Sequence, residues 1–218
     1  MRNRFDRELD LLHQELIEMG AMIESNIAAA IDALMKKDAV KAQAAIDADP
    51  EVDEKERTIE RHCLRLLLQQ QPVASDLRRI STALKMITDM ERIGDHAADI
   101  SEITLRLCQQ QEAVDLRLLP QMAGAASDML RRAIDAFVRQ DLALASRVIA
   151  DDDVVDDLFN QIKNALIVRI HANVESGELA VDLLMVAKYL ERIGDHAVNL
   201  SEWVIFSLTG QHKNERIL

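Results

Sequence analysis

Apolar residues recur at steps of three and four along the start of the chain. They place one apolar face on a helix of about thirty residues, roughly 45 Å long at about 1.5 Å of rise per residue. A seam of that length is typical of a helical bundle rather than of a compact α/β domain. Its members are Phe5, Leu9, Leu12, Leu16, Met19, Ile23, Ile27, Ile31 and Leu34.

Proline and capping residues divide the rest of the chain into five further helices. Asp38 is placed to cap the second helix, and Pro72 marks a sharp turn after it. Pro50 follows Asp49, so we expect the second helix to kink there or to restart with Asp49 as its N-cap. The expected helices after the first are 38–70, 73–110, 116–139, 142–173 and 179–208, with a turn at 175–177.

The two halves of the sequence repeat each other. The segment ERIGDHA at residues 91–97 recurs at residues 191–197, and AIDA at residues 30–33 recurs at residues 133–136. Six helices in two repeats predict an all-α fold, without any sheet, made of two tandem, pseudo-symmetric three-helix bundles. The expected domains are 1–112 and 113–209, with the boundary near the aperiodic segment 111–115 and a flexible tail over 210–218.

Composition and charge exclude several functional classes. Of the 218 residues, 49% are hydrophobic, which is too many for a disordered chain, and only 3% are aromatic, which is unlike a β-sandwich. The net charge is −12 and there is no basic stripe, so we expect no nucleic-acid binding, and cations or basic protein surfaces as partners. The sequence has no signal peptide, no apolar run long enough to cross a membrane, and no CxxC motif. We therefore expect a cytoplasmic protein that is peripheral to membrane complexes at most.

Each half also carries two acidic pairs with the spacing acid-x-x-x-Asp. Side chains at i and i+4 share a helix face with Cβ atoms about 5–6 Å apart, so two carboxylates placed there repel unless a cation lies between them. One such pair by itself is more typical of a solvated charged face. The pairs are Asp49/Asp53 and Glu91/Asp95 in the first half, and Asp152/Asp156 and Glu191/Asp195 in the second.

Two further patterns indicate that these carboxylates converge. The apolar seam over residues 77–87 reaches Glu91 at its next step, and Glu191 falls on the matching seam of the last helix. Burying a carboxylate on such a seam costs folding free energy unless the carboxylate is paired or ligated. Asp53 and Glu91 each lie 19 residues from Pro72, so antiparallel helices bring them face to face. Four carboxylates are therefore expected to converge in each half, as in metal sites of helical bundles.

The two predicted sites differ in charge, and arginines compete with a cation for both. Asp99 extends the first site by one helical turn, whereas Asn199 stands at the equivalent position of the second. Oxygen donors favour Mg, Mn or Fe, and Zn or Ni becomes an option where a histidine joins. His96 and His196 point about 100° around the helix from the key Asp residues, so packing is the better interpretation for them. A salt-bridge network would replace the metal, and its candidate members are Arg57, Arg61, Arg92 and Arg192.

The twin ERIGDHA segments, the acid-x-x-x-Asp pairs and the segment PVASDLRRI at residues 72–80 resemble the PhoU family of phosphate-uptake regulators, over about residues 5–208. The resemblance implies multinuclear metal clusters on these pairs in some members, with Fe, Mn, Mg or Zn as candidate ions. It also implies a homodimer that negatively controls the phosphate regulon through the ATPase subunit of the phosphate ABC transporter and a membrane sensor histidine kinase. The family motif falls here on the eight paired residues, of which Asp49 is the least secure because of Pro50.

Two other classes of function compete with this interpretation. A carboxylate-bridged di-metal oxidase or metal-storage bundle of the ferritin type uses Glu-x-x-His pairs, and the chain has none. A nucleotide-dependent phosphoryl-transfer enzyme needs a phosphate-binding loop such as GxxxxGK[ST], which the sequence also lacks. The sequence therefore predicts a metal-binding regulator that is not an enzyme, with the ferritin-like protein as the alternative.

Overall fold

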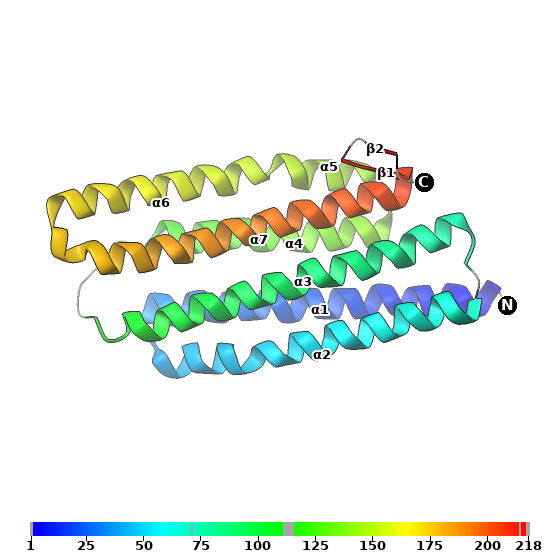
Figure 1. Ribbon diagram of the computed structural model, residues 1–218, viewed down its shortest axis with the longest axis horizontal. Helices are drawn as coiled ribbons and strands as arrows, with labels where there is room; N and C mark the ends of the chain where they lie inside the picture. Colours follow the sequence, from blue (N-terminus) through cyan, green and yellow to red (C-terminus); the bar gives the residue numbers. More distant parts are fainter. Residues whose placement is uncertain (1, 71, 111–115, 214, 217–218) are drawn as a thin grey trace.

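The structure, a computed structural model, describes every residue except 1, 71, 111–115, 214, 217 and 218 (Figure 1). The expected boundary between the halves at 111–115 lies outside the described residues. Six helical rods are present in this part of the chain, the fifth of them in two pieces. The elements are α1 (Arg2–Lys36), α2 (Ala39–Gln70), α3 (Ala74–Leu107), α4 (Leu118–Arg139), α5 (Leu142–Ala150), α6 (Asp152–Ala172), η1 (Val174–Ser176), α7 (Gly177–Thr209), β1 (Gln211–His212) and β2 (Glu215–Arg216).

The rods pack side by side with their long axes nearly parallel (Figure 1). In that view α3 and α7 lie in front, α1 and α4 lie behind them, and α2 and α6 flank the group at the bottom and the top. Helices α1–α3 form one three-helix unit, and α4, α5/α6 and α7 form the other. This arrangement confirms the predicted all-helical fold. Among the described helices, none is long and apolar enough to cross a membrane.

The repeat is visible in the backbone where the first helix of each unit ends. Lys37 has φ 50° and Gln140 has φ 56°, both in the left-handed region that ends a helix. The Asp38 side chain then caps α2 by accepting hydrogen bonds from the Val40 and Lys41 amides, each at 3.1 Å. Asp141 accepts from the Leu144 amide at 2.9 Å in the same way. The predicted Asp38 cap is confirmed, and it has a counterpart in the second unit.

All nine positions of the predicted α1 seam are buried, at most 9% exposed. The seam predicted for α3 is correct at Ile80 and Ile87, but Leu77 is 41% exposed and Leu84 is only partly buried. The reason is that α3 packs against α1, α2 and α7 with an arc whose centre lies to one side of the predicted seam, so the seam follows the edge of this arc. Glu91 consequently lies at the edge of that arc with its side chain 22% exposed.

The two units share one hydrophobic core. Helices α3 and α7 pack against each other along the junction, and α1 contacts α4 behind them. Buried side chains from both units, such as Met90 on α3 and Leu190 on α7, belong to a single continuous cluster. The repeats are therefore tandem in sequence but are packed as one body.

Three local expectations need correction. Of the two expectations for Pro50 only the restart is wrong, because α2 is unbroken there and its packing against α1 and α3 offsets the lost backbone hydrogen bond. The kink stays a prediction. The fifth helix is instead interrupted at Asp151, the first of three consecutive aspartates, which are poor helix-interior residues. The tail, expected to be frayed and without β-structure, contains the antiparallel pair β1–β2, and His212 stacks on Trp203 of α7 with ring centroids 4.0 Å apart.

Candidate metal sites

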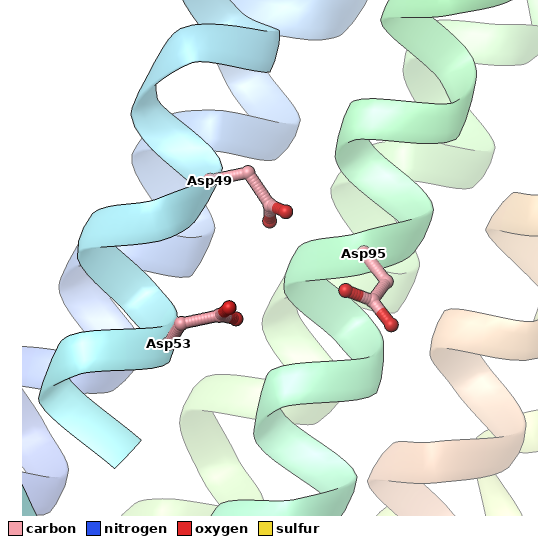
Figure 2. Close-up of side chains that lie close together, drawn as sticks. All are labelled: Asp49, Asp53 and Asp95. Atoms are coloured by element: carbon pink, nitrogen blue, oxygen red, sulfur yellow. The ribbon is translucent and has the colours of Figure 1, made fainter. Parts of the chain in front are cut away.

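The first acidic site lies between α2 and α3 (Figure 2). Asp49 and Asp53 project from α2, one helical turn apart, and Asp95 projects toward them from α3. One carboxylate oxygen of each lies within 4.8 Å of one from each of the others. In the part of the chain that the structure describes, this is the one set of three acidic, histidine or cysteine side chains with that spacing.

Asp49 carries the clearest electrostatic signature of the site. It has no ion pair or hydrogen bond with any described side chain. Burial, followed by the charges of Asp95, Asp53 and Asp99, raises the pKa of Asp49 to about 6. The continuity of α2 through Pro50 keeps Asp49 on the same helix face as Asp53, so the residue that the sequence left least secure is part of the cluster.

Glu91 and Asp99 lie around this trio rather than within it. The Arg92 Nε atom is 3.5 Å from a Glu91 oxygen, and Arg92 Nη1 donates to Asp95 at 3.0 Å. Asp99 faces His96 Nδ1 at 3.3 Å. Burial and the nearby carboxylates of Asp95, Glu56 and Asp53 raise the pKa of Glu91, although Arg92 opposes the shift.

Of the four arginines predicted to compete with a cation, two contact this site. Arg92 pairs with Glu91 and Asp95, and Arg57 Nη2 is 3.5 Å from Asp53. Arg61 pairs with Glu54, which lies outside the trio. Both contacting arginines are more than half exposed, so water screens their charges. They pair with two of the three members of the trio and leave Asp49 unpaired.

The second unit places Asp152 and Asp156 on α6 opposite Glu191 and Asp195 on α7. Burial, followed by Asp156, Asp195, Asp153 and Glu191, raises the pKa of Asp152 to about 6, which mirrors Asp49. The oxygens are less closely gathered than in the first unit, since no trio of described residues here meets the 4.8 Å spacing. The expected convergence of four carboxylates in each half is thus seen as a close trio in the first half and a looser group in the second.

Three substitutions between the repeats make the second site less acidic, although Asp153, at the position of Pro50, adds one carboxylate there. Asn199 replaces Asp99, as the sequence indicates. Phe159 stands where α2 has Glu56, and Lys188 stands where α3 has Thr88. The Lys188 ammonium group pairs with Glu191 and lies 5.6 Å from the centroid of the Phe159 ring. Glu56, whose charge helps to raise the pKa of Glu91, was not among the predicted site residues. Its position one turn after Asp53 nevertheless puts it on the same helix face.

Gly94 and Gly194 allow each helix pair to approach closely at its site. A Cβ atom added to Gly94 would lie 3.2 Å from the Val52 side chain and 3.5 Å from an Asp49 oxygen. One added to Gly194 would lie 3.2 Å from Asp152 and 3.3 Å from Val155. The glycine of each ERIGDHA segment is therefore explained by helix packing beside the carboxylates.

The histidines of the two segments lie at the junction between the units, where His96 also contacts Asp99 at the edge of the first acidic site. His96 stacks on Tyr189 with centroids 5.3 Å apart, and its ring centroid is 5.6 Å from that of His196. His196 Nδ1 is 2.8 Å from an oxygen of Asp89. Burial is the main cause that lowers the pKa of His96. Their interpretation as packing residues agrees with this placement.

The doubled arrangement of helices has counterparts in known proteins. The sequence profile of the PhoU domain matches residues 16–104 and again residues 119–204. The chain belongs to the PhoU family. It is 37% identical over 211 residues to a "Phosphate-specific transport system accessory protein PhoU homolog" of Clostridium acetobutylicum, covering 96% of each chain. A PhoU homologue of Thermotoga maritima is 34% identical over 212 residues, covering 97% of this chain and 91% of that protein.

Solved PhoU structures have the same fold. The crystal structure of PhoU from Pseudomonas aeruginosa aligns with a TM-score of 0.88 at 32% identity, covering 95% of this chain and all of that one. The phosphate transport system regulatory protein PhoU from Streptococcus pneumoniae also gives 0.88, at 28% identity, covering 95% of this chain and 98% of that one. The resemblance seen in the sequence is thus confirmed. So is the prediction that the chain is not an enzyme, because these relatives are accessory and regulatory proteins.

Proposed function

We propose that this PhoU protein is a regulatory accessory protein of phosphate-specific transport whose two acidic sites bind metal ions. The observation that carries the metal assignment is Asp49, a partly buried carboxylate with like charges around it and no cationic partner among the described residues. A carboxylate in that position is stabilised by a bound cation. The family membership and the named relatives support the role in phosphate transport.

The donor set fits a hard divalent or trivalent cation. Metal–oxygen bonds of roughly 2.0–2.6 Å allow two ligands on opposite sides of one ion to be about 4–5 Å apart. The oxygens of Asp49, Asp53 and Asp95 lie within 4.8 Å of one another, so they can share one ion. Because the donors of the trio are all carboxylate oxygens and no histidine is among them, Mg, Mn or Fe suits it better than Zn. Glu91 and Asp99 in the first site, and Asp152, Asp156, Glu191 and Asp195 in the second, are the further proposed ligands.

The regulatory role rests on family membership rather than on the geometry of the site. In this proposal the protein acts in the cytoplasm as a homodimer. It represses the phosphate regulon by contacting the ATPase subunit of the phosphate ABC transporter and a membrane sensor histidine kinase. Bound metal would hold α2 against α3 and α6 against α7, and so maintain the surface that these partners contact.

Removing two ligands from one site should release metal from that site alone. We expect Glu91→Ala with Asp95→Ala to lose the metal of the first unit, and Glu191→Ala with Asp195→Ala to lose that of the second, because each helix pair supplies its own carboxylates. Elemental analysis of protein purified without chelator or nickel resin measures both ratios. Unchanged ratios in both variants would show that the arginines satisfy the carboxylates instead.

The regulatory part of the proposal has a separate readout. A strain that lacks its own PhoU protein is complemented with the wild type or with each double variant, and a phosphate-starvation promoter is measured in high phosphate. Repression by the wild type supports the proposed role. Failure of the wild type to repress, in cells that contain the folded protein, contradicts the role whatever the metal content.

The charge difference between the sites predicts a difference in affinity. Thr88→Lys places an ammonium group in the first site, and we expect it to weaken metal binding there about tenfold, or ~1.4 kcal/mol. Lys188→Thr should strengthen the second site to a similar extent. Each change is made in the double variant that lacks the other site, and calorimetric titration with Mn²⁺ gives the affinity. A Thr88→Ser variant controls for the loss of the threonine.

A further inference from the structure

The fifth rod of the bundle is broken at Asp151, one residue before the proposed ligand Asp152. Helix α5 ends at Ala150 and α6 begins at Asp152. At the break the Val154 amide donates to the Asp151 carbonyl at 3.0 Å, which is the i to i+3 bond of a 3₁₀ turn. Such a turn is wound more tightly than an α-helix, so the side chains of α6 point in directions that are offset from those of α5. The direction of Asp152 is therefore set at this break.

An arginine of α4 holds the break in place. Arg132 Nη2 lies 2.7 Å from a carboxylate oxygen of Asp151, and Arg132 Nε lies 2.7 Å from one of Asp128, one turn earlier on α4. The Arg132 side chain is 27% exposed, against 58% for the neighbouring Arg131, whose ion pair is with Asp128. One guanidinium group thus ties the break to α4. We call Asp128, Arg132 and Asp151 the α4 clamp.

The first repeat has neither the α4 clamp nor the break. Its α2 is a single helix through the equivalent segment. At the positions of Asp128, Arg132 and Asp151 the first repeat has Ser25, Ala29 and Ala48. A hydroxyl group and two methyl groups cannot form an ion pair, so the clamp and the break occur together in the second repeat alone.

Both repeats nonetheless place the first aspartate of the pair against the glycine of the ERIGDHA segment. A Cβ added to Gly94 would lie 3.5 Å from Asp49 Oδ1, and one added to Gly194 would lie 3.2 Å from Asp152 Oδ1. The continuous α2 needs no anchor for this placement, because its own hydrogen bonds define the direction of Asp49. A broken helix lacks that constraint across the break. The second repeat therefore depends on a contact from another helix.

We propose that Arg132 is a positioning residue of the second metal site. By holding Asp151 against α4, it fixes the turn that directs the Asp152 carboxylate toward α7. This inference rests on the proposed function, because Asp152 is a proposed ligand. It makes that site depend on α4, a helix that supplies none of its proposed carboxylate ligands.

Charge alone would give Arg132 the opposite effect on metal binding. A guanidinium group near the site repels a cation, so an arginine that acted only through its charge would weaken binding. Arg132→Lys separates the two effects, because lysine keeps the positive charge. Its single ammonium group does not provide the two separate contacts that Nε and Nη2 make. We expect this variant to raise the Kd of the second site for Mn²⁺ about tenfold, the lower end of the range for residues that support a metal ligand.

The titration is made in the background of Glu91→Ala with Asp95→Ala, which removes the first site, and calorimetry gives the Kd for Mn²⁺. Arg131→Lys is the matched control, because it changes the adjacent and more exposed arginine of α4 in the same way. We expect this control to leave the Kd unchanged within about twofold, since exposed ion pairs contribute little.

A double-mutant cycle tests whether Arg132 acts through Asp151. Asp151→Ala removes the partner of Arg132 at the break and introduces the residue that the first repeat has at Ala48. In the Asp151→Ala protein, Arg132→Lys should have no further effect on the Kd, because the contact through which it acts is already lost. A full tenfold effect in that protein would show that Arg132 acts by another route and would overturn the inference.

Hydrogen exchange gives a readout that needs no metal. In chelator-treated protein, the amides of residues 151–156 should exchange faster in Arg132→Lys than in Arg131→Lys or the wild type, since the anchor of the break is lost. Equal Kd values and equal exchange in the two lysine variants contradict the inference. If the background protein binds no Mn²⁺, the proposed function of the second site fails. Faster exchange in Arg132→Lys would then still support the α4 clamp, and equal exchange would overturn it.

Discussion

Removing the bound cations with a chelator at pH 7 should lower the melting temperature by about 5–10 °C. A ligand at a hundredfold excess over its Kd stabilises the native state by about 2.7 kcal/mol, and 1 kcal/mol corresponds to about 2–4 °C for a chain of 150–250 residues. The physical reason is that Asp49, Asp53 and Asp95 repel one another in the metal-free protein. Thermal melts followed by circular dichroism, with and without chelator, measure the effect.

The pH dependence of the metal-free protein should have an unusual sign. Asp49 and Asp152 have a pKa of about 6 in the folded protein, against the usual 3.8 of an exposed aspartate. A folded pKa above the unfolded one means that protonation favours the folded state. This contribution is therefore gained as the pH falls from 7 through 6, and is complete below about 4. His13 and His96 act in the opposite direction, because burial lowers the pKa of each.

Comparison with a variant isolates the carboxylates from the histidines. Asp49→Asn with Asp152→Asn keeps the shape of both sites and removes the two titrating groups. We subtract the free energy of unfolding of the metal-free variant from that of the metal-free wild type. This difference should increase as the pH falls from 7 to 5. The metal-loaded wild type should lose stability over the same range, because protons compete with the cation for the same oxygens. If chelator-treated and untreated protein have identical pH trends, no metal is bound.

Leu190→Ala should lower the free energy of unfolding by about 2–5 kcal/mol, the usual cost of a cavity at a fully buried leucine. Leu190 is 0% exposed on α7 and belongs to the core shared by both units. Because α7 packs against α3 as well as against α4 and α6, the loss should destabilise both repeats. Guanidinium unfolding followed by circular dichroism should show a single transition at lower denaturant.

Hydrogen exchange resolves where the stability is lost. The amides of α1, in the other repeat, should exchange faster in Leu190→Ala, as should those of α6. Leu68→Ala is the control, because Leu68 is 83% exposed and its loss should change stability by no more than about 0.5 kcal/mol. Two separate transitions, or faster exchange confined to residues 118–209, would mean that the repeats unfold independently.

Local sequence patterns predicted much of the fold because their physical causes are local. The α1 seam was predictable at every position, since one helix face must be apolar wherever it packs on a core. The Asp38 cap followed from its position directly before a helix. The α3 seam was less accurate at Leu77 and Leu84, because the number of neighbours around a helix is a property of the assembled bundle.

The candidate sites, too, have some features that the sequence predicts and others that only the structure shows. The sequence by itself determined the helices, the repeat and the acidic pairs, since spacing along a helix places Asp49 with Asp53 and repetition places a second set 103 residues later. Only the tertiary structure decided that Asp95 of α3, rather than Glu91, completes the trio with Asp49 and Asp53, and that no such trio forms among the described residues of the second site. These features depend on distances between side chains of different helices. Such distances are set by packing against the whole core, and periodicity along one helix does not contain them.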